Sequence, residues 1–174
     1  MSDLGAPPSA PWRAGLIEDF ARSELFDHTF QEGMDLVDET AFYLDGAGRQ
    51  DSKLLSRNAA LAYAAESMRL TTRLMQVASW LLVQRAVRDG DMAPEAASQE
   101  GYRLGAEAGC ARIETTREGL PQTLTQLLDR SARLYEHICH LDRRMYLETA
   151  GVAAPAHPVL AQFERLRGVF GSQP

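Results

Sequence analysis

The stretch from Ser52 to Arg88 contains neither glycine nor proline, and it constrains the fold more than any other part of the chain. One uninterrupted helix of about 36 residues, roughly 54 Å long, is the structure that it predicts. Two apolar sets run along this stretch on neighbouring faces, one recurring every seven residues: Leu54, Leu61, Met68, Met75 and Leu82 in the first, Tyr63, Leu70, Leu74, Val77 and Leu81 in the second. A helix that is apolar on more than one face needs more than one neighbour, so we expect it to form the centre of a helical bundle.

Two further stretches show the three-and-four spacing of an apolar helix face. The first precedes Gly46 and the second follows Pro121; they comprise Phe26, Phe30, Met34, Val37, Ala41 and Leu44, then Leu124, Leu127, Ser131, Leu134, Ile138, Leu141 and Met145. The short loop from Gly46 to Asp51 makes the first two helices antiparallel neighbours. Residues 89–119 predict a long connection with at most a short helix after Pro94. No stretch has a strand pattern, so the prediction is an all-α antiparallel three-helix bundle with a long second connection.

The chain of 174 residues is expected to form one domain between two flexible ends. Residues 1–17 are rich in proline and glycine and predict a flexible N-terminal arm, although Ile17 and its apolar neighbours could dock on the bundle. Residues 18–150 form the predicted bundle, and residues 151–174 form a flexible C-terminal tail. Four apolar residues of the tail are candidates for partner binding, the alternative being that they fold back onto the bundle: Leu160, Phe163, Leu166 and Phe170.

The net charge of −6 argues against a nucleic-acid partner, and its distribution is uneven. Residues 18–51 are strongly acidic, whereas residues 52–88 carry six bases and one acid. Opposite charges on neighbouring helices favour their pairing. The surplus acid on the first helix would remain accessible to a partner.

No apolar stretch is long enough to span a bilayer, and the first residues do not resemble a secretory signal. Two cysteines with no partner pattern fit a reducing compartment. We therefore expect a cytoplasmic protein without membrane insertion.

Few residue patterns in the sequence are typical of catalytic or metal-binding sites. His137 and His140 are spaced as two metal ligands could be, but no third ligand is predictable and two surface histidines are the simpler interpretation. A di-iron bundle needs Glu-x-x-His, which is absent from the sequence. Cys110 has no activating neighbour in the pattern, and no phosphate-binding loop or nucleophile elbow is present. The sequence thus predicts no catalytic residue, no metal and no cofactor.

Two alternatives remain open at this point. A histidine phosphotransfer-like bundle in a signalling relay would use an exposed histidine such as His28, although no lysine follows it closely. Met68, Met75 and Trp80 could line a ligand pocket, although methionine at such spacing usually packs in a core.

The whole pattern resembles the RcdA family, alphaproteobacterial adaptors that help the ClpXP protease degrade cell-cycle regulators. The likeness is strongest from Leu74 to Arg88 and continues through Met92. It extends over about residues 20–148 and includes these positions of the first and last helices: Phe26, Phe30, Leu36, Tyr43, Leu134, Tyr135, His140 and Met145.

The resemblance implies a dimeric three-helix bundle that binds proteins and catalyses no reaction. Its expected partners are the ClpXP machinery with its priming factors, and regulator cargo such as the response regulator CtrA, with the protein concentrated at a cell pole. Tyr63, Leu70 and Val77 are the candidate face for the homodimer, the alternative being that these residues pack within one subunit.

Overall fold

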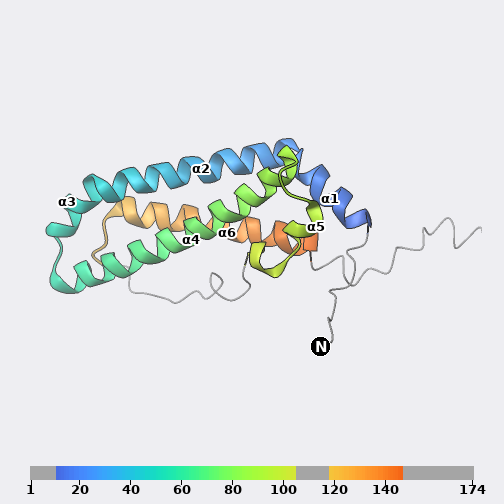
Figure 1. The fold of residues 1–174 in the computed structure, drawn as a ribbon. Coiled ribbons are helices and arrows are strands. Elements are labelled where there is room, and N and C mark those ends of the chain that lie inside the picture. Colours follow the sequence, from blue (N-terminus) through green and yellow to red (C-terminus); the bar gives the residue numbers. More distant parts are fainter. Residues whose placement is uncertain (1–10, 105–117, 147–174) are drawn as a thin grey trace, which may run out of the picture.

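The computed structural model describes residues 11–104 and 118–146, and in this part of the chain it is entirely helical, with no strand. Three long helices form the bundle: α2 (Glu24–Asp45), α4 (Arg57–Asp89) and α6 (Gln122–Tyr146). Shorter elements flank them, namely α1 (Pro11–Ala21), α3 (Ala47–Lys53), α5 (Pro94–Ala97) and the 3₁₀ turn η1 (Glu100–Tyr102). Figure 1 shows the three long helices side by side, with α3 at one end of the bundle and α1 and α5 at the other. The predicted all-α bundle is confirmed.

Side-chain contacts give the direction of α2 relative to its neighbours. Asp27, near the start of α2, pairs with Arg88 at the end of α4. Glu39, near the end of α2, pairs with Arg130 in the first half of α6 at 2.6 Å. Helix α2 is therefore antiparallel to both of the other long helices, as the short connection before α4 requires.

The two remaining helices, α4 and α6, run in the same direction. Arg73 donates a hydrogen bond to Ser131 Oγ at 3.0 Å, and eleven residues further along α4 Gln84 donates to the hydroxyl of Tyr146 at 3.1 Å. Contacts that advance together along both helices require a parallel pair. The prediction of an antiparallel bundle is thus correct for α2 but not for this pair, because the long connection after α4 can return to the far end before α6 begins.

Hydroxyl and glycine caps fix the ends of the long helices. Ser23 and Ser56 precede α2 and α4, and each side-chain oxygen accepts a hydrogen bond from a backbone N–H of the first turn. Gly90 ends α4 in the left-handed conformation, with φ of +81°. The central helix therefore begins later than the predicted Ser52, because Ser56 supplies the cap and Leu54 lies in the preceding turn.

Two segments that the sequence placed outside the helices, one in the flexible N-terminal arm and one in a short loop, are helical. Residues 11–17 belong to α1, and Ile17 is fully buried against the bundle, as its apolar character allowed. The predicted loop after Gly46 contains α3, whose Asp51 accepts a hydrogen bond from the Tyr43 hydroxyl at 3.1 Å. The tail, residues 151–174, lies outside the described residues.

The second apolar set of α4 lies in the core. Tyr63, Leu70, Leu74, Val77 and Leu81 are all buried. They pack with buried side chains of the other helices, which include Phe26, Leu36, Leu124, Leu127, Leu134, Tyr135 and Ile138. The core thus takes one face of α4 and leaves the heptad face for other contacts.

Candidate protein-interaction surface

The heptad face of α4 is exposed over the full length of the helix. Four of its large apolar side chains, together with Leu54 in the turn before the helix, have between 50% and 87% of their surface accessible, and we call them the outer stripe: Leu54, Leu61, Met68, Met75 and Leu82. Isolated exposed apolar residues are normal on a protein surface, but a regular row of five is not. A seven-residue repeat is the spacing with which one helix packs along another.

The residues between the large side chains of the outer stripe are small. Ala65, Thr72 and Ser79 are exposed and small, so a second helix could approach the backbone of α4 closely. The Thr72 hydroxyl donates to the carbonyl oxygen of Met68 at 2.9 Å, and that of Thr71 donates to Ser67 at 2.9 Å. Because these donors are satisfied within α4, a partner can cover them at little cost.

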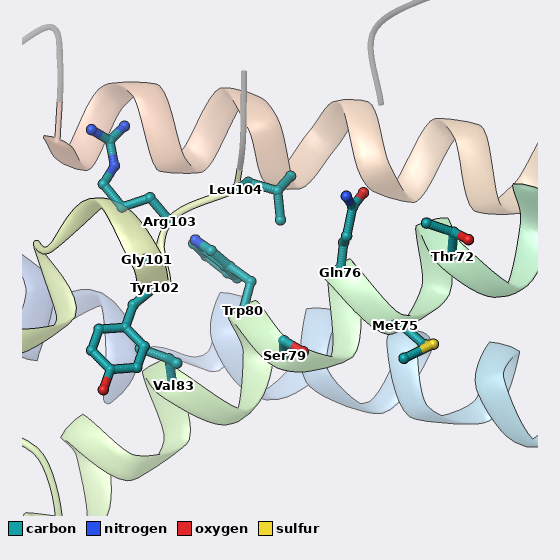
Figure 2. Close-up of a pocket in the computed structure, with 10 residues that line it drawn as sticks. All are labelled: Thr72, Met75, Gln76, Ser79, Trp80, Val83, Gly101, Tyr102, Arg103 and Leu104. Atoms are coloured by element: carbon teal, nitrogen blue, oxygen red, sulfur yellow. The ribbon is translucent and has the colours of Figure 1, made fainter. Parts of the chain in front are cut away.

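A groove of about 460 Å³ borders the outer stripe and separates α4 from the segment around η1. Figure 2 shows Gln76 and Trp80 projecting from α4 toward α6 within it. The lining residues are Thr72, Met75, Gln76, Ser79, Trp80, Val83, Gly101, Tyr102, Arg103 and Leu104. Three of them also lie on the face of α4 that carries the outer stripe, so the groove widens this surface rather than forming a separate cavity.

Buried polar contacts hold the η1 side of the groove in place. The carboxylate of Asp142 accepts hydrogen bonds from Trp80 Nε1 at 3.0 Å and from the Arg103 guanidinium at 2.8 Å. The same guanidinium lies 5.0 Å from the ring centre of Tyr146, a cation–π distance. Burial is the main cause that raises the pKa of Tyr146, whose hydroxyl accepts a hydrogen bond from Gln84. The groove wall is thus fixed by a charge pair that joins three segments.

The candidate residues for a dimer face lie in the core and not on the outer stripe. Tyr63 is 8% exposed, and Leu70 and Val77 are fully buried within one chain. Their placement matches the alternative of packing within one subunit, because the core takes this face of α4 and the outer stripe faces away from it.

The structure separates the other candidate residues. His137 and His140 are exposed on α6, Cys139 is half-buried between them, and His28 is exposed on α2. In the described ranges no cluster of three or more His, Cys, Asp or Glu side chains could hold a metal ion. Met68 and Met75 point outward and Trp80 inward, so only Met75 and Trp80 share the groove. Cys110 and the four tail residues Leu160, Phe163, Leu166 and Phe170 lie outside the described residues.

Comparisons with known proteins identify the family. A family profile described as a protein of unknown function, DUF1465, matches residues 17–170. The crystal structure of RcdA from Caulobacter crescentus CB15 is 68% identical in sequence and matches with a TM-score of 0.62, covering 75% of this chain and 98% of that chain. The chain belongs to the RcdA family. This confirms the resemblance seen in the sequence.

Neither match names an enzymatic activity. No curated protein matches the sequence. In the part of the chain that the structure describes, no helix is long and apolar enough to cross a membrane.

Sequence reasoning found the outer stripe but did not place it on the surface. The signal was present, since its large residues alternate with Ala65, Thr72 and Ser79, whereas the second set is uniformly large. One exposed aromatic residue was missed entirely. Phe42 on α2 has 84% of its surface accessible, and only its position outside the three-and-four stripe of that helix could have revealed it.

Proposed function

We propose that this protein is a non-enzymatic adaptor that helps deliver cell-cycle regulators, such as the response regulator CtrA, to the ClpXP protease. The observation that carries the proposal is the 68% identity with RcdA over nearly all of that chain. The geometry supports it, because the rigid bundle presents the outer stripe and its adjoining groove as a preformed surface for other polypeptides.

Tethering is the mechanism that this arrangement favours. An adaptor that holds cargo and protease together turns their encounter into an intramolecular event, which raises the effective concentration without new chemistry. The protease is brought to the adaptor by its priming factors. Delivery then takes place in the cytoplasm, where we propose that the protein is concentrated at a cell pole.

We assign the second contact of the tether to the C-terminal tail. Leu160, Phe163, Leu166 and Phe170 recur at helical spacing in a segment with few other apolar anchors. A short apolar motif at the end of a chain can bind a partner while the bundle holds cargo.

The outer stripe is the proposed homodimer contact. Its members are placed symmetrically about Met68, so an antiparallel pairing of two α4 helices brings Leu61 opposite the partner's Met75 and Met68 opposite its own copy. A parallel pairing would instead bring each arginine of α4 next to the same arginine of the other copy, where like charges repel.

Capture on an inactive protease tests the adaptor proposal. Full-length protein is incubated with a ClpXP variant that binds but does not degrade, together with the priming factors and one purified regulator. The proposal expects a complex in which the regulator is retained only when this protein is present. Retention that is independent of the protein, or acid-labile phosphate on His28 after incubation with a phosphodonor, would contradict it and favour the phosphotransfer alternative.

A further inference from the structure

The outer side of α2 carries a second surface that the fold does not use. Four residues spaced by three, four and three positions share one stripe of this helix, and we call them the acidic face: Asp35, Asp38, Phe42 and Asp45. All four are exposed, and Phe42 is 84% exposed in the middle of the three acids. A large aromatic ring that is left in water between charges contributes almost nothing to the core.

Other acids of the same helix do serve the fold. Asp27 pairs with Arg88 of α4, and Glu39 pairs with Arg130 of α6 at 2.6 Å. These two contacts account for the acids that point toward the neighbouring helices. Helix α2 therefore has two kinds of acid, one that joins the bundle and one that faces away from it.

The acidic face has no base from another long helix in the described part of the chain. Asp35 accepts a hydrogen bond from Gln31 at 2.7 Å, and Asp45 has the exposed Arg49 at 3.4 Å one turn further on. No lysine or arginine occurs anywhere in α2. The negative charge of Asp35 and Asp38 is thus not neutralised by the fold itself.

The end of α2 adds to this negative potential. Asp45 is the last residue of the helix, and no basic residue occupies the last turn. The carbonyl end of a helix carries partial negative charge, so an acid there is unfavourable for the helix by itself. The exposed Phe42 ring lies three residues before this helix end.

We infer that the acidic face is a docking site for a basic polypeptide segment in which lysine or arginine flanks one bulky apolar side chain. The apolar side chain packs on the Phe42 ring, as aromatic anchors do at interface centres. The flanking cations pair with Asp35, Asp38 and Asp45, and an arginine can also lie over the ring. The inference concerns a different helix from the outer stripe and requires neither the homodimer nor the protease.

A labelled synthetic peptide tests the inference without cargo or protease, so that its failure is independent of the adaptor proposal. The probe is a helical peptide with arginines and lysines around one central leucine. The control peptide has the same sequence with serine in place of that leucine. Binding to the full-length protein is followed by fluorescence anisotropy at low and high salt. We expect the leucine peptide to bind, more weakly at high salt, and the serine peptide to bind less well.

Two variants and a matched control locate the site. Phe42→Ser should weaken binding of the leucine peptide about tenfold. Asp35→Asn with Asp38→Asn should weaken it and reduce its salt dependence. Glu100→Gln with Glu136→Gln makes the same change in net charge at exposed positions of η1 and α6 and should leave binding unchanged.

Cross-linking gives a readout that does not depend on the variants folding. A photoreactive group in place of the central leucine should label the segment around Phe42 of the wild-type protein. Absence of binding at low salt, equal binding by Phe42→Ser, an equal loss in the control, or labelling confined to other helices would each overturn the inference.

Discussion

The guanidinium of Arg103 lies 2.8 Å from the carboxylate of Asp142 and joins the segment after η1 to the last turns of α6. Only 18% of the Arg103 side chain and 4% of the Asp142 side chain are exposed. The same carboxylate accepts the indole N–H of Trp80, so one buried acid connects α4, α6 and the long connection. This contact fixes the wall of the groove beside the outer stripe.

Replacing Asp142 with asparagine should destabilise the protein strongly. The amide keeps the shape and can still accept from Trp80, but the mostly buried charge of Arg103 loses its carboxylate partner. Breaking one side of a buried pair costs about 3–5 kcal/mol. Urea unfolding measures the loss, with Glu136→Gln as the control because it removes an exposed acid from the same helix. Equal stability of the two variants would contradict the role of the pair.

Gly33 of α2 lies against Leu81 and Val77 of α4. A Cβ added there would lie 2.5 Å from Leu81 Cδ1, so Gly33→Ala should displace the buried Leu81 side chain and cost about 1–3 kcal/mol. Gly15→Ala is the matched control, because a Cβ there meets nothing within 4 Å and alanine favours helix α1. Thermal unfolding should show a lower midpoint for the first variant and an equal or higher one for the second. A Gly33→Ala protein as stable as wild type would show that the contact is looser than described.

The two faces of α4 should respond oppositely to charge. Leu70→Glu places a carboxylate in the core, because Leu70 is fully buried, and should abolish cooperative folding. Met68→Glu adds the same charge to a side chain that is 72% exposed, and should leave the helix content unchanged. Sedimentation should then show a folded monomer for Met68→Glu and a dimer for wild type. A Met68→Glu protein that remains a dimer would remove the outer stripe as the homodimer contact.

Stability should fall at high pH through Tyr43. Burial is the main cause that raises the pKa of its phenol, and the hydrogen bond to Asp51 adds to it. The unfolded phenol titrates near pH 10, so the folded state keeps the proton more tightly. Its contribution to the free energy of unfolding is complete below about pH 10 and is lost as the pH rises toward the folded pKa.

Urea unfolding at a series of alkaline pH values tests this dependence. Tyr43→Phe should be less stable than wild type at neutral pH and should lose less stability on the alkaline side. Tyr102→Phe is the control, since its ring is 43% exposed and its variant should follow the wild-type curve. Parallel curves for wild type and Tyr43→Phe would contradict the prediction.

The fold was largely predictable because apolar spacing follows which helix faces are buried. The stripe of α6 led directly to core residues such as Leu124 and Ile138. On α2 the predicted stripe lies one residue away from the buried face, so Phe26 is in the core but Ala41 is exposed, and Leu36 and Tyr43 are buried instead. The direction of α6 was not predictable, because residues 90–121 are long enough to allow either orientation. On α4 the pattern was ambiguous, because the helix has two apolar faces and either could be the one buried in the core. Periodicity alone does not show which of the two faces solvent.

The interaction surfaces were less accessible to sequence reasoning for a related physical reason. The identity of a leucine or methionine does not show whether its side chain is exposed or buried. The outer stripe could therefore be recognised as a surface only from the structure, in which the opposite face of α4 packs in the core. The acidity of α2 was evident in the sequence, but the contrast between Glu39, which pairs with Arg130, and Asp38, which faces solvent, depends on how α6 lies against α2.

Degradation of a purified cell-cycle regulator by ClpXP, in the presence of its priming factors, tests the adaptor proposal most directly. Adding the full-length protein should accelerate loss of the regulator, and a chain cut after Gly151 should keep its helix content but give no acceleration. A degradation rate that is the same with and without the full-length protein would contradict the account.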